Sequence, residues 1–224
     1  MWWYIVFVKS QKIEPKFENN QNPRIGLIAL ATDLVIEKDF ISVIKDKKID
    51  FFVNRIECYN PLTKENLIKM SENITQVTRD ILPEQKLDCV VYACTSGTIA
   101  AGYDNIKKLS IFTPYSKKVN DNVVDYFKSS GFEITSNSYF DIHSDMEIGK
   151  VDQNYLFDVL INLDVSEADA LFVSCTALPV LPLIQKLEDK LGIPVLSSNQ
   201  ALIWESLENI GENKSVKGFG RLFD

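Results

Sequence analysis

The chain has 224 residues, 46% of them hydrophobic and 25% charged, and carries a formal net charge of −7. This length allows one large or two small domains with a sizeable core. The negative charge argues against nucleic acid as a partner, since no basic stripe offsets it, and no apolar run is long enough to suggest a membrane partner. The four cysteines lack CxxC spacing and the only histidine is His143, so we expect no metal site and a reducing, cytoplasmic compartment.

The first half of the chain begins with a predicted N-terminal extension, residues 1–23. Its apolar start, residues 1–8, lacks the basic leader and the cleavage site of a signal peptide. Short apolar runs bounded by turn residues then predict buried strands, and apolar positions at helical spacing predict helices. The strands are expected at 24–30, 50–56 and 87–93, and the helices at 34–44, at 63–82 with Thr63 as the N-cap, and in brief form at 97–105.

The second half repeats this alternation of strands and helices. Strands are expected at 108–114, 132–140, 169–175 and 193–197, and a loop at 141–151. Helices are expected at 119–129, at 153–163, after Pro179 and up to 210 with Ser198 as the N-cap. Alternation of this kind implies parallel sheets with right-handed crossovers. The fold class is therefore α/β, with two pseudo-symmetric lobes at 24–107 and 108–224, each a parallel sheet flanked by helices. The active site is expected in the cleft between the lobes.

An internal repeat marks where the chemistry is expected. Residues 88–98 and 169–179 both read as Asp, then an apolar run, then Cys-Thr, so that Cys94 and Cys175 occupy equivalent places. Each cysteine falls at the carboxyl end of a predicted parallel strand, which is where open α/β sheets bind ligands. Free N–H groups and hydroxyls at a following helix start stabilise a thiolate and also accept a carboxylate. The pair predicts one site with a sulfur on each side.

Simpler interpretations compete with this one at each position. A cysteine is often a small buried hydrophobe, an interpretation that suits Cys89 and Cys58. His143 has no partner at a motif spacing and is more typical of a surface residue. Arg55 could hold a carboxylate through two hydrogen bonds or form a surface ion pair, and Tyr115 could donate to an anion or be buried with a satisfied hydroxyl.

Several motifs together resemble the aspartate/glutamate racemase superfamily: RIGLI at 24–28, YACTS at 92–96, SIFTPY at 110–115, SCTA at 174–177 and SNQA at 198–201. Within it the chain most resembles the branch of maleate cis-trans isomerases and arylmalonate decarboxylases. The segments LATD at 30–33 and VNRI at 53–56 are similar to the ectoine-utilisation proteins of that branch.

The resemblance implies two α/β lobes, no cofactor, and one cysteine from each lobe facing a cleft. It makes Cys94 the nucleophile or base and Cys175 the acid or base. It implies that Thr95, Ser96 and Tyr115 donate hydrogen bonds to a substrate carboxylate. The expected substrate-binding set also includes Thr176, Asp33 and Arg55.

The chain departs from the family at three places. Maleate isomerases carry asparagine where this chain has Asp33 and Met146, and an acid in place of an amide would repel a second carboxylate. They also have a longer connection, with an extra strand and helix, where residues 97–107 must serve here. A shortened first lobe or a missing segment would explain the difference.

The leading hypothesis is a cofactor-independent, two-cysteine isomerase or racemase of a small carboxylic acid, of maleate isomerase or Asp/Glu racemase type, with a role in ectoine catabolism suggested by the resemblance. One alternative is an arylmalonate-type decarboxylase that uses Cys175. Another is an inactive small-acid binding protein. Assembly of the chain into a homo-oligomer is left open.

Overall fold

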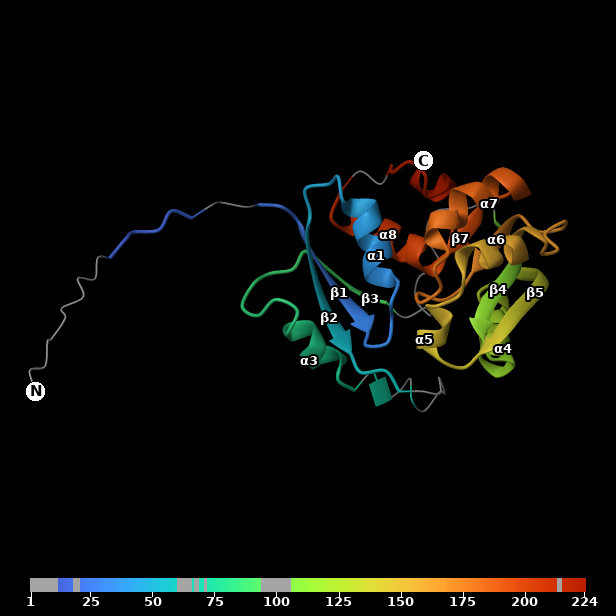
Figure 1. The fold of residues 1–224 in the computed structure, drawn as a ribbon, viewed down its shortest axis with the longest axis horizontal. Helices are drawn as coiled ribbons and strands as arrows, with labels where there is room; N and C mark the ends of the chain where they lie inside the picture. The colour runs from blue at the N-terminus through green and yellow to red at the C-terminus, as the bar shows by residue number, and fades with distance from the viewer. Residues whose placement is uncertain are drawn as a thin grey trace, which may run out of the picture.

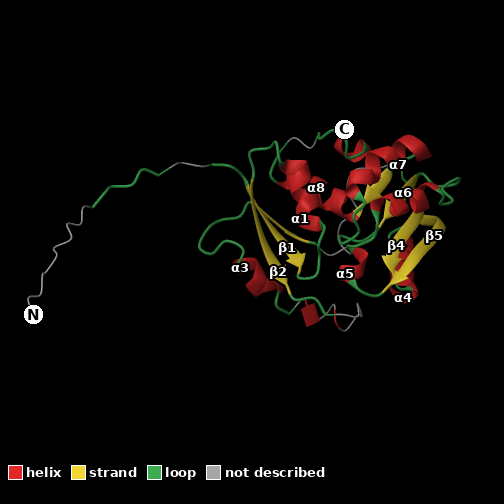
Figure 2. Ribbon diagram, viewed as in Figure 1, coloured by secondary structure: helices red, strands yellow, loops and turns green. Residues whose placement is uncertain are grey.

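The structure, a computed structural model, describes residues 12–17, 21–59, 66, 69–70, 72–93, 106–212 and 215–224. Within these ranges the chain forms two separate parallel sheets with helices around them (Figures 1 and 2). The α/β class and the two helix-flanked parallel sheets expected from the alternation of elements are confirmed.

The first sheet has the strand order β2-β1-β3, and all its pairs are parallel. Its central strand is a continuous apolar run in which every residue after the first is buried, as a strand with neighbours on both sides and helices on its faces requires. The elements of this half are β1 (Arg24–Leu30), α1 (Ile36–Ile44), β2 (Asp50–Ile56), α3 (Ile74–Arg79) and β3 (Cys89–Tyr92).

The second sheet has the order β5-β4-β6-β7 and is also parallel throughout. Its elements are β4 (Lys108–Tyr115), α4 (Lys117–Ser129), β5 (Glu133–Ile142), α5 (Asp145–Ile148), α6 (Gln153–Ile161), β6 (Ala170–Val173), η2 (Leu181–Leu183), α7 (Ile184–Leu191), β7 (Val195–Ser197), α8 (Ser198–Asn209) and η3 (Arg221–Phe223). Gly131 and Gly192 follow the ends of α4 and α7 with φ of +94° and +76°, the left-handed conformation that glycine adopts without strain.

The last long helix, α8, joins the two halves of the molecule. It contacts α1 and β3 on one side and β7 on the other, and Figure 1 shows it between the two sheets. Most of its residues are buried, which a helix with neighbours on several faces requires. Because α8 packs against both halves, it holds the two sheets in a defined arrangement relative to each other.

The two halves share the same backbone contacts around their central strands. Asp88, just before β3, accepts a hydrogen bond from the N–H of Arg24 at 2.9 Å, and Asp169, just before β6, accepts one from the N–H of Lys108 at 2.8 Å. At the other end of the same strands, the N–H of Ala93 donates to Ile28, and the N–H of Ser174 donates to Phe112. The repeat seen in the sequence is thus a repeat of structure, and Ala93 and Ser174 hold equivalent positions.

Some expected elements differ from the structure. The helix expected over 63–82 is interrupted by a turn at Glu72 and Asn73 and ends at Arg79. The loop expected at 141–151 contains the short helix α5. The N-cap of α8 is Ser197 rather than Ser198, because the Ser197 hydroxyl accepts from the N–H of Gln200 and the Gln200 side chain accepts from the Ser197 N–H in a capping box.

Two expectations lie outside what the structure tests. Residues 1–11 and the brief helix expected at 97–105 fall outside the described ranges, and the domain boundaries at 23 and 107 stay predictions. Among the described residues, the first sheet has three strands where the second has four. No helix of the described part is long and apolar enough to cross a membrane.

Candidate functional site

The carboxyl ends of strands from both sheets meet at one place. Thr32, just after β1, donates its hydroxyl to Asp145 at 3.3 Å, and the Cys58 thiol, just after β2, donates to the same carboxylate at 3.5 Å. Asp145 follows β5, whereas Tyr115 ends β4 and Cys175 follows β6. Strand ends of this kind are where α/β sheets bind ligands.

Cys175 is the buried thiol of this cluster, and its backbone is strained. Its φ of +99° is a value that non-glycine residues rarely adopt, and the residue is 3% exposed. The sulfur accepts hydrogen bonds from the Tyr115 hydroxyl and from the N–H of Ala177. The Cys175 N–H in turn donates to the Ser198 hydroxyl at 3.1 Å. A strained residue held by several partners is typical of functional sites, because the surroundings must over-determine it.

The ionisation of Cys175 is set by burial and by neighbouring acids. Burial raises the pKa of the thiol far above its ordinary value, and the charges of Asp145 and Asp33 raise it further. The hydrogen bonds from Tyr115 and Ala177 lower the pKa of the thiol but do not offset the burial. A raised pKa favours the protonated thiol, which suits a proton donor better than a nucleophile.

The start of α8 holds the backbone beside Cys175. The amide nitrogen of Asn199 donates to the carbonyl of Thr176 at 2.9 Å and to Asp39 of α1 at 2.7 Å. Asp39 is 5% exposed, and burial raises its pKa to about 7 against the lowering effect of the Asn199 hydrogen bond. The hydrogen bond between Asp39 and Asn199 links α1 to α8. The same Asn199 amide holds the carbonyl of Thr176, the residue after Cys175.

Asp33 and Asp145 bring two buried carboxyls to the cluster. One oxygen of Asp33 accepts from the N–H groups of Val35 and Ile36 at 2.7 and 2.9 Å, beside the start of α1. Its second oxygen, Oδ2, is buried without a hydrogen-bond partner among the described residues. Burial raises the pKa of Asp145; the Cys58 thiol lowers it, whereas the Asp33 charge raises it.

Arg55 is engaged by the protein itself. Its guanidinium donates to the carbonyls of Leu30, Ala31 and Asp33 at 2.9 to 3.2 Å and pairs with Glu37 at 2.6 Å. These bonds fasten the turn between β1 and α1, and through it the position of Asp33. The geometry thus assigns Arg55 a structural role in this turn, and its contact with a substrate stays a prediction.

The structure brings together some of the residues predicted from sequence. Cys175, Tyr115 and Asp33 belong to the cluster, and Thr176 adjoins it. His143 lies apart, with its side chain 65% exposed and 3.8 Å from Asp141. The predicted partners Cys94, Thr95 and Ser96 lie outside the described residues.

Sequence reasoning missed four residues of the cluster: Asp145, Cys58, Asn199 and Asp39. The signals for them were weak. Asn199 belongs to the motif at 198–201, which indicates no role for that residue, and the pattern around Asp145 predicts a loop rather than α5. Cys58 was interpreted as a buried hydrophobe, whereas its thiol is a donor to Asp145.

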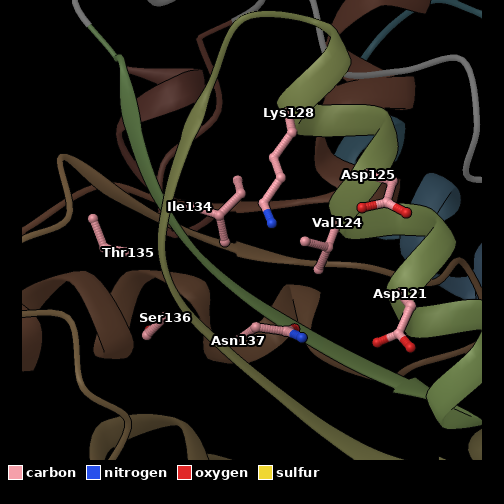
Figure 3. A pocket seen from close by; sticks show the side chains of 8 residues that line it. All are labelled: Asp121, Val124, Asp125, Lys128, Ile134, Thr135, Ser136 and Asn137. Carbon is pink, nitrogen blue, oxygen red and sulfur yellow. The ribbon is translucent and has the colours of Figure 1, made fainter.

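Two other features do not compete as sites. Within the described ranges there is no group of three or more His, Cys, Asp or Glu side chains that could hold a metal ion. A hollow of about 550 Å³ opens between α4 and β5, with Asp121, Asp125 and Lys128 among its lining (Figure 3). None of the residues that line it belongs to the strand-end cluster.

Comparisons with known proteins identify relatives that cover most or half of the chain. A maleate isomerase of Geobacillus stearothermophilus is 26% identical, with 89% of this chain and 96% of that protein covered. The alignment runs over 243 positions, more than the 224 residues here, so that relative has residues this chain lacks. A maleate isomerase of Alcaligenes faecalis is 32% identical over 117 residues, which are 52% of this chain and 46% of that protein.

Solved structures show the same fold. A maleate cis-trans isomerase mutant of Nocardia farcinica with a covalently bound succinylcysteine intermediate matches with a TM-score of 0.81 and 21% identity, covering 90% of this chain and 98% of that one. The model of the arylmalonate decarboxylase family matches residues 72–223, more than half of the chain. The chain therefore belongs to the arylmalonate decarboxylase family, whose relatives found here include maleate isomerases.

Proposed function

We propose that this chain is a cofactor-independent isomerase or racemase of a small carboxylic acid and that Cys94 and Cys175 act together in the reaction. The observation that carries the proposal is the setting of Cys175: a strained, buried thiol that accepts hydrogen bonds from Tyr115 and Ala177. A thiol of this kind is suited to give a proton to carbon. Cys94, which occupies the place equivalent to Cys175 in the sequence repeat, supplies the second sulfur that such a reaction requires.

The two thiols divide the work by their ionisation. Cys94, as a thiolate, removes the proton from the carbon next to the substrate carboxylate. The electron pair of the broken C–H bond moves toward the carboxylate, which gives an enediolate. Cys175 then gives its proton to the opposite face of the same carbon, and a proton exchange restores both thiols. The substrate carboxylate is held by Thr95, Ser96 and Tyr115, whose donors stabilise the charge as it develops.

An unsaturated acid would follow a related course. The Cys94 thiolate adds to one carbon of the double bond, and the electrons again move into the carboxylate. Rotation about the carbon–carbon bond, which is now single, followed by expulsion of the thiolate gives the other geometric isomer. The succinylcysteine intermediate of the Nocardia farcinica isomerase is the carbon-protonated form of such a sulfur adduct.

Decarboxylation is the second candidate, and the Cys175 thiol favours it independently of Cys94. Loss of CO₂ from a substituted malonate leaves the same enediolate, which needs only one proton donor. The family model that matches residues 72–223 bears the name of this activity. Solvent would return the proton to Cys175 after each turnover.

Single cysteine variants separate these reactions. Turnover is measured with maleate, with single enantiomers of small 2-substituted acids in D₂O, and with an arylmalonate by CO₂ release, for wild type, Cys94→Ala and Cys175→Ala. Cys89→Ala is the matched control, because Cys89 lies half-buried in β3 and makes no hydrogen bond to the cluster. The two-thiol reaction requires both cluster variants to lose activity by orders of magnitude and the control to keep it.

The outcomes distinguish the alternatives. Retention of CO₂ release in Cys94→Ala, with loss in Cys175→Ala, would assign the decarboxylase. Full turnover in both variants on a verified substrate would refute any role for the thiols. Small acids that bind wild type without turnover would instead indicate an inactive binding protein.

Three broader features belong to the same proposal. A role in ectoine utilisation is supported by the motifs at 30–33 and 53–56. A reducing, cytoplasmic location is supported by Cys89 and Cys175, which form no disulfide among the described residues. The partner is a small carboxylate rather than nucleic acid or membrane, and light scattering at two protein concentrations tests whether the chain forms a homo-oligomer.

A further inference from the structure

The Oδ2 atom of Asp33 is a buried acceptor without a partner. The residue is 0% exposed, and Oδ2 has no hydrogen bond from any described residue, although Oδ1 accepts two. Leaving a buried polar oxygen unpaired costs free energy, so such atoms in native proteins call for an explanation. A ligand group that donates hydrogen bonds is one explanation, and the position of Asp33 favours it.

Asp145 adds a second carboxyl beside the first. Its Oδ2 accepts from Thr32, the residue next to Asp33, and from Cys58, whereas its Oδ1 has no hydrogen bond among the described residues. The turns that carry the two acids touch, since a Cβ placed on Gly149 just after α5 would lie 3.3 Å from the Cβ of Leu34. Oδ2 of Asp33 and Oδ1 of Asp145, which come from different halves of the molecule, thus lie in one region, the Asp33–Asp145 corner.

This corner adjoins the candidate reaction centre. The negative charges of Asp145 and Asp33 both act on Cys175, which places the acids within electrostatic reach of the sulfur. A substrate held at Cys175 by one end would therefore bring its other end toward these acids. A second carboxylate there would face two like charges, whereas an ammonium group offers three donors and an opposite charge.

We propose that Asp33 and Asp145 form a binding site for an ammonium group, so that the substrate is a small zwitterionic acid with one carboxylate and one amine rather than a dicarboxylate. This inference rests on the proposed function for the place of the carboxylate. Oδ2 of Asp33 and Oδ1 of Asp145, which accept no hydrogen bond from the described residues, accept from the ammonium. Thr32 and Cys58 hold Asp145 in place through its other oxygen.

Calorimetric binding to three probes of equal chain length tests the proposal. β-Alanine, succinate and 3-hydroxypropanoate share one carboxylate and differ at the far end, which is an ammonium, a carboxylate or a hydroxyl. Wild type is expected to bind β-alanine about tenfold or more tightly than either of the others, the scale of a charge-assisted hydrogen bond. Asp33→Asn and Asp145→Asn are each expected to reduce that preference by about tenfold.

The variants include their own controls. Asparagine keeps one side-chain oxygen, so Asp33→Asn keeps an acceptor for the N–H groups of Val35 and Ile36, and Asp145→Asn tests the same site from the other half of the molecule. Asp46→Asn removes one negative charge at an exposed position after α1 and should leave the preference unchanged.

No binding of β-alanine to wild type, equal binding of succinate or 3-hydroxypropanoate, or an unchanged preference in both cluster variants would overturn the proposal. These titrations need no turnover, so they are independent of the cysteine assay. An ammonium preference without cysteine-dependent turnover would retain the binding site and refute the proposed function. Cysteine-dependent turnover without a preference for the ammonium probe would retain the proposed function and refute the ammonium site.

Discussion

Replacing Asp39 with asparagine should make the protein more stable at alkaline pH and nearly unchanged at acid pH. Asp39 lies on α1, 5% exposed, and accepts a hydrogen bond from Asn199 of α8 at 2.7 Å. Burial raises its pKa from 3.8 to about 7. Asparagine keeps an acceptor for Asn199 and adds N–H donors, and the Oδ1 of Asn199 is a buried acceptor that has no partner among the described residues.

The magnitude follows from the linkage between protonation and folding. Between pH 3.8 and about 7 the folded chain keeps the Asp39 proton whereas the unfolded chain has lost it, so wild type loses stability as pH rises through this window. Each pH unit in that window costs about 1.4 kcal/mol. From pH 5 to pH 8 the loss attributable to Asp39 is therefore roughly 3 kcal/mol, and asparagine, which does not titrate, abolishes it.

Urea unfolding followed by far-ultraviolet circular dichroism at pH 5 and pH 8 measures this difference. The free energy of unfolding of Asp39→Asn minus that of wild type should increase by roughly 3 kcal/mol between the two pH values. Subtracting wild type removes the contributions of other titrating groups, and exposed Asp46→Asn is the control. A difference that stays constant within about 0.5 kcal/mol would show that Asp39 does not titrate in this range, and the electrostatic reasoning would fail.

Three substitutions test the packing and hydrogen bonding of the fold, each by urea unfolding at one pH. Gly26→Ala places a Cβ 2.7 Å from the Leu87 side chain and should cost about 1–3 kcal/mol, whereas no loss would mean that Leu87 moves freely. Ser197→Ala removes the capping box with Gln200 and should cost about 1 kcal/mol, and an unchanged midpoint would argue that Ser198 serves as the cap. Arg55→Gln removes donors to three carbonyls of the turn after β1 and should cost about 1–2 kcal/mol of stability. Arg55→Lys should cost less, because it keeps the charge but not the fork of donors. Equal stability of wild type and both variants would show that these bonds do not stabilise the turn.

The sheets were predictable because buried parallel strands have a strong local signature. The strand at 24–30 matches its predicted bounds because it is a continuous buried apolar run between turn residues. The strand at 50–56 also matches, although polar residues interrupt it and only Ile56 is buried. The repeat also predicted that the two halves share a plan, and the matched bonds of Asp88 and Asp169 show why aspartate recurs there: each ties its strand to the start of the neighbouring one.

The cluster was only partly predictable because its partners are distant in sequence. Thr32 and Asp145 are 113 positions apart, and Asp39 and Asn199 are 160 apart, so neither pair has a spacing that a motif could reveal. The four-residue helix α5, which positions Asp145, is too short to show a helical period. The capping residue of α8 was misplaced by one position because two serines stand side by side.

The electrostatic surroundings of Cys175 are what the structure adds to the sequence repeat. Ala93 and Ser174 make equivalent hydrogen bonds at the ends of β3 and β6. Around Cys175, however, burial and two acids from different strand ends keep the proton on sulfur. In a reaction that needs one base and one acid, the thiol that is harder to ionise takes the acid role. The acids Asp33 and Asp145 would thus serve twice, by holding the far end of the substrate and by assigning the proton donor.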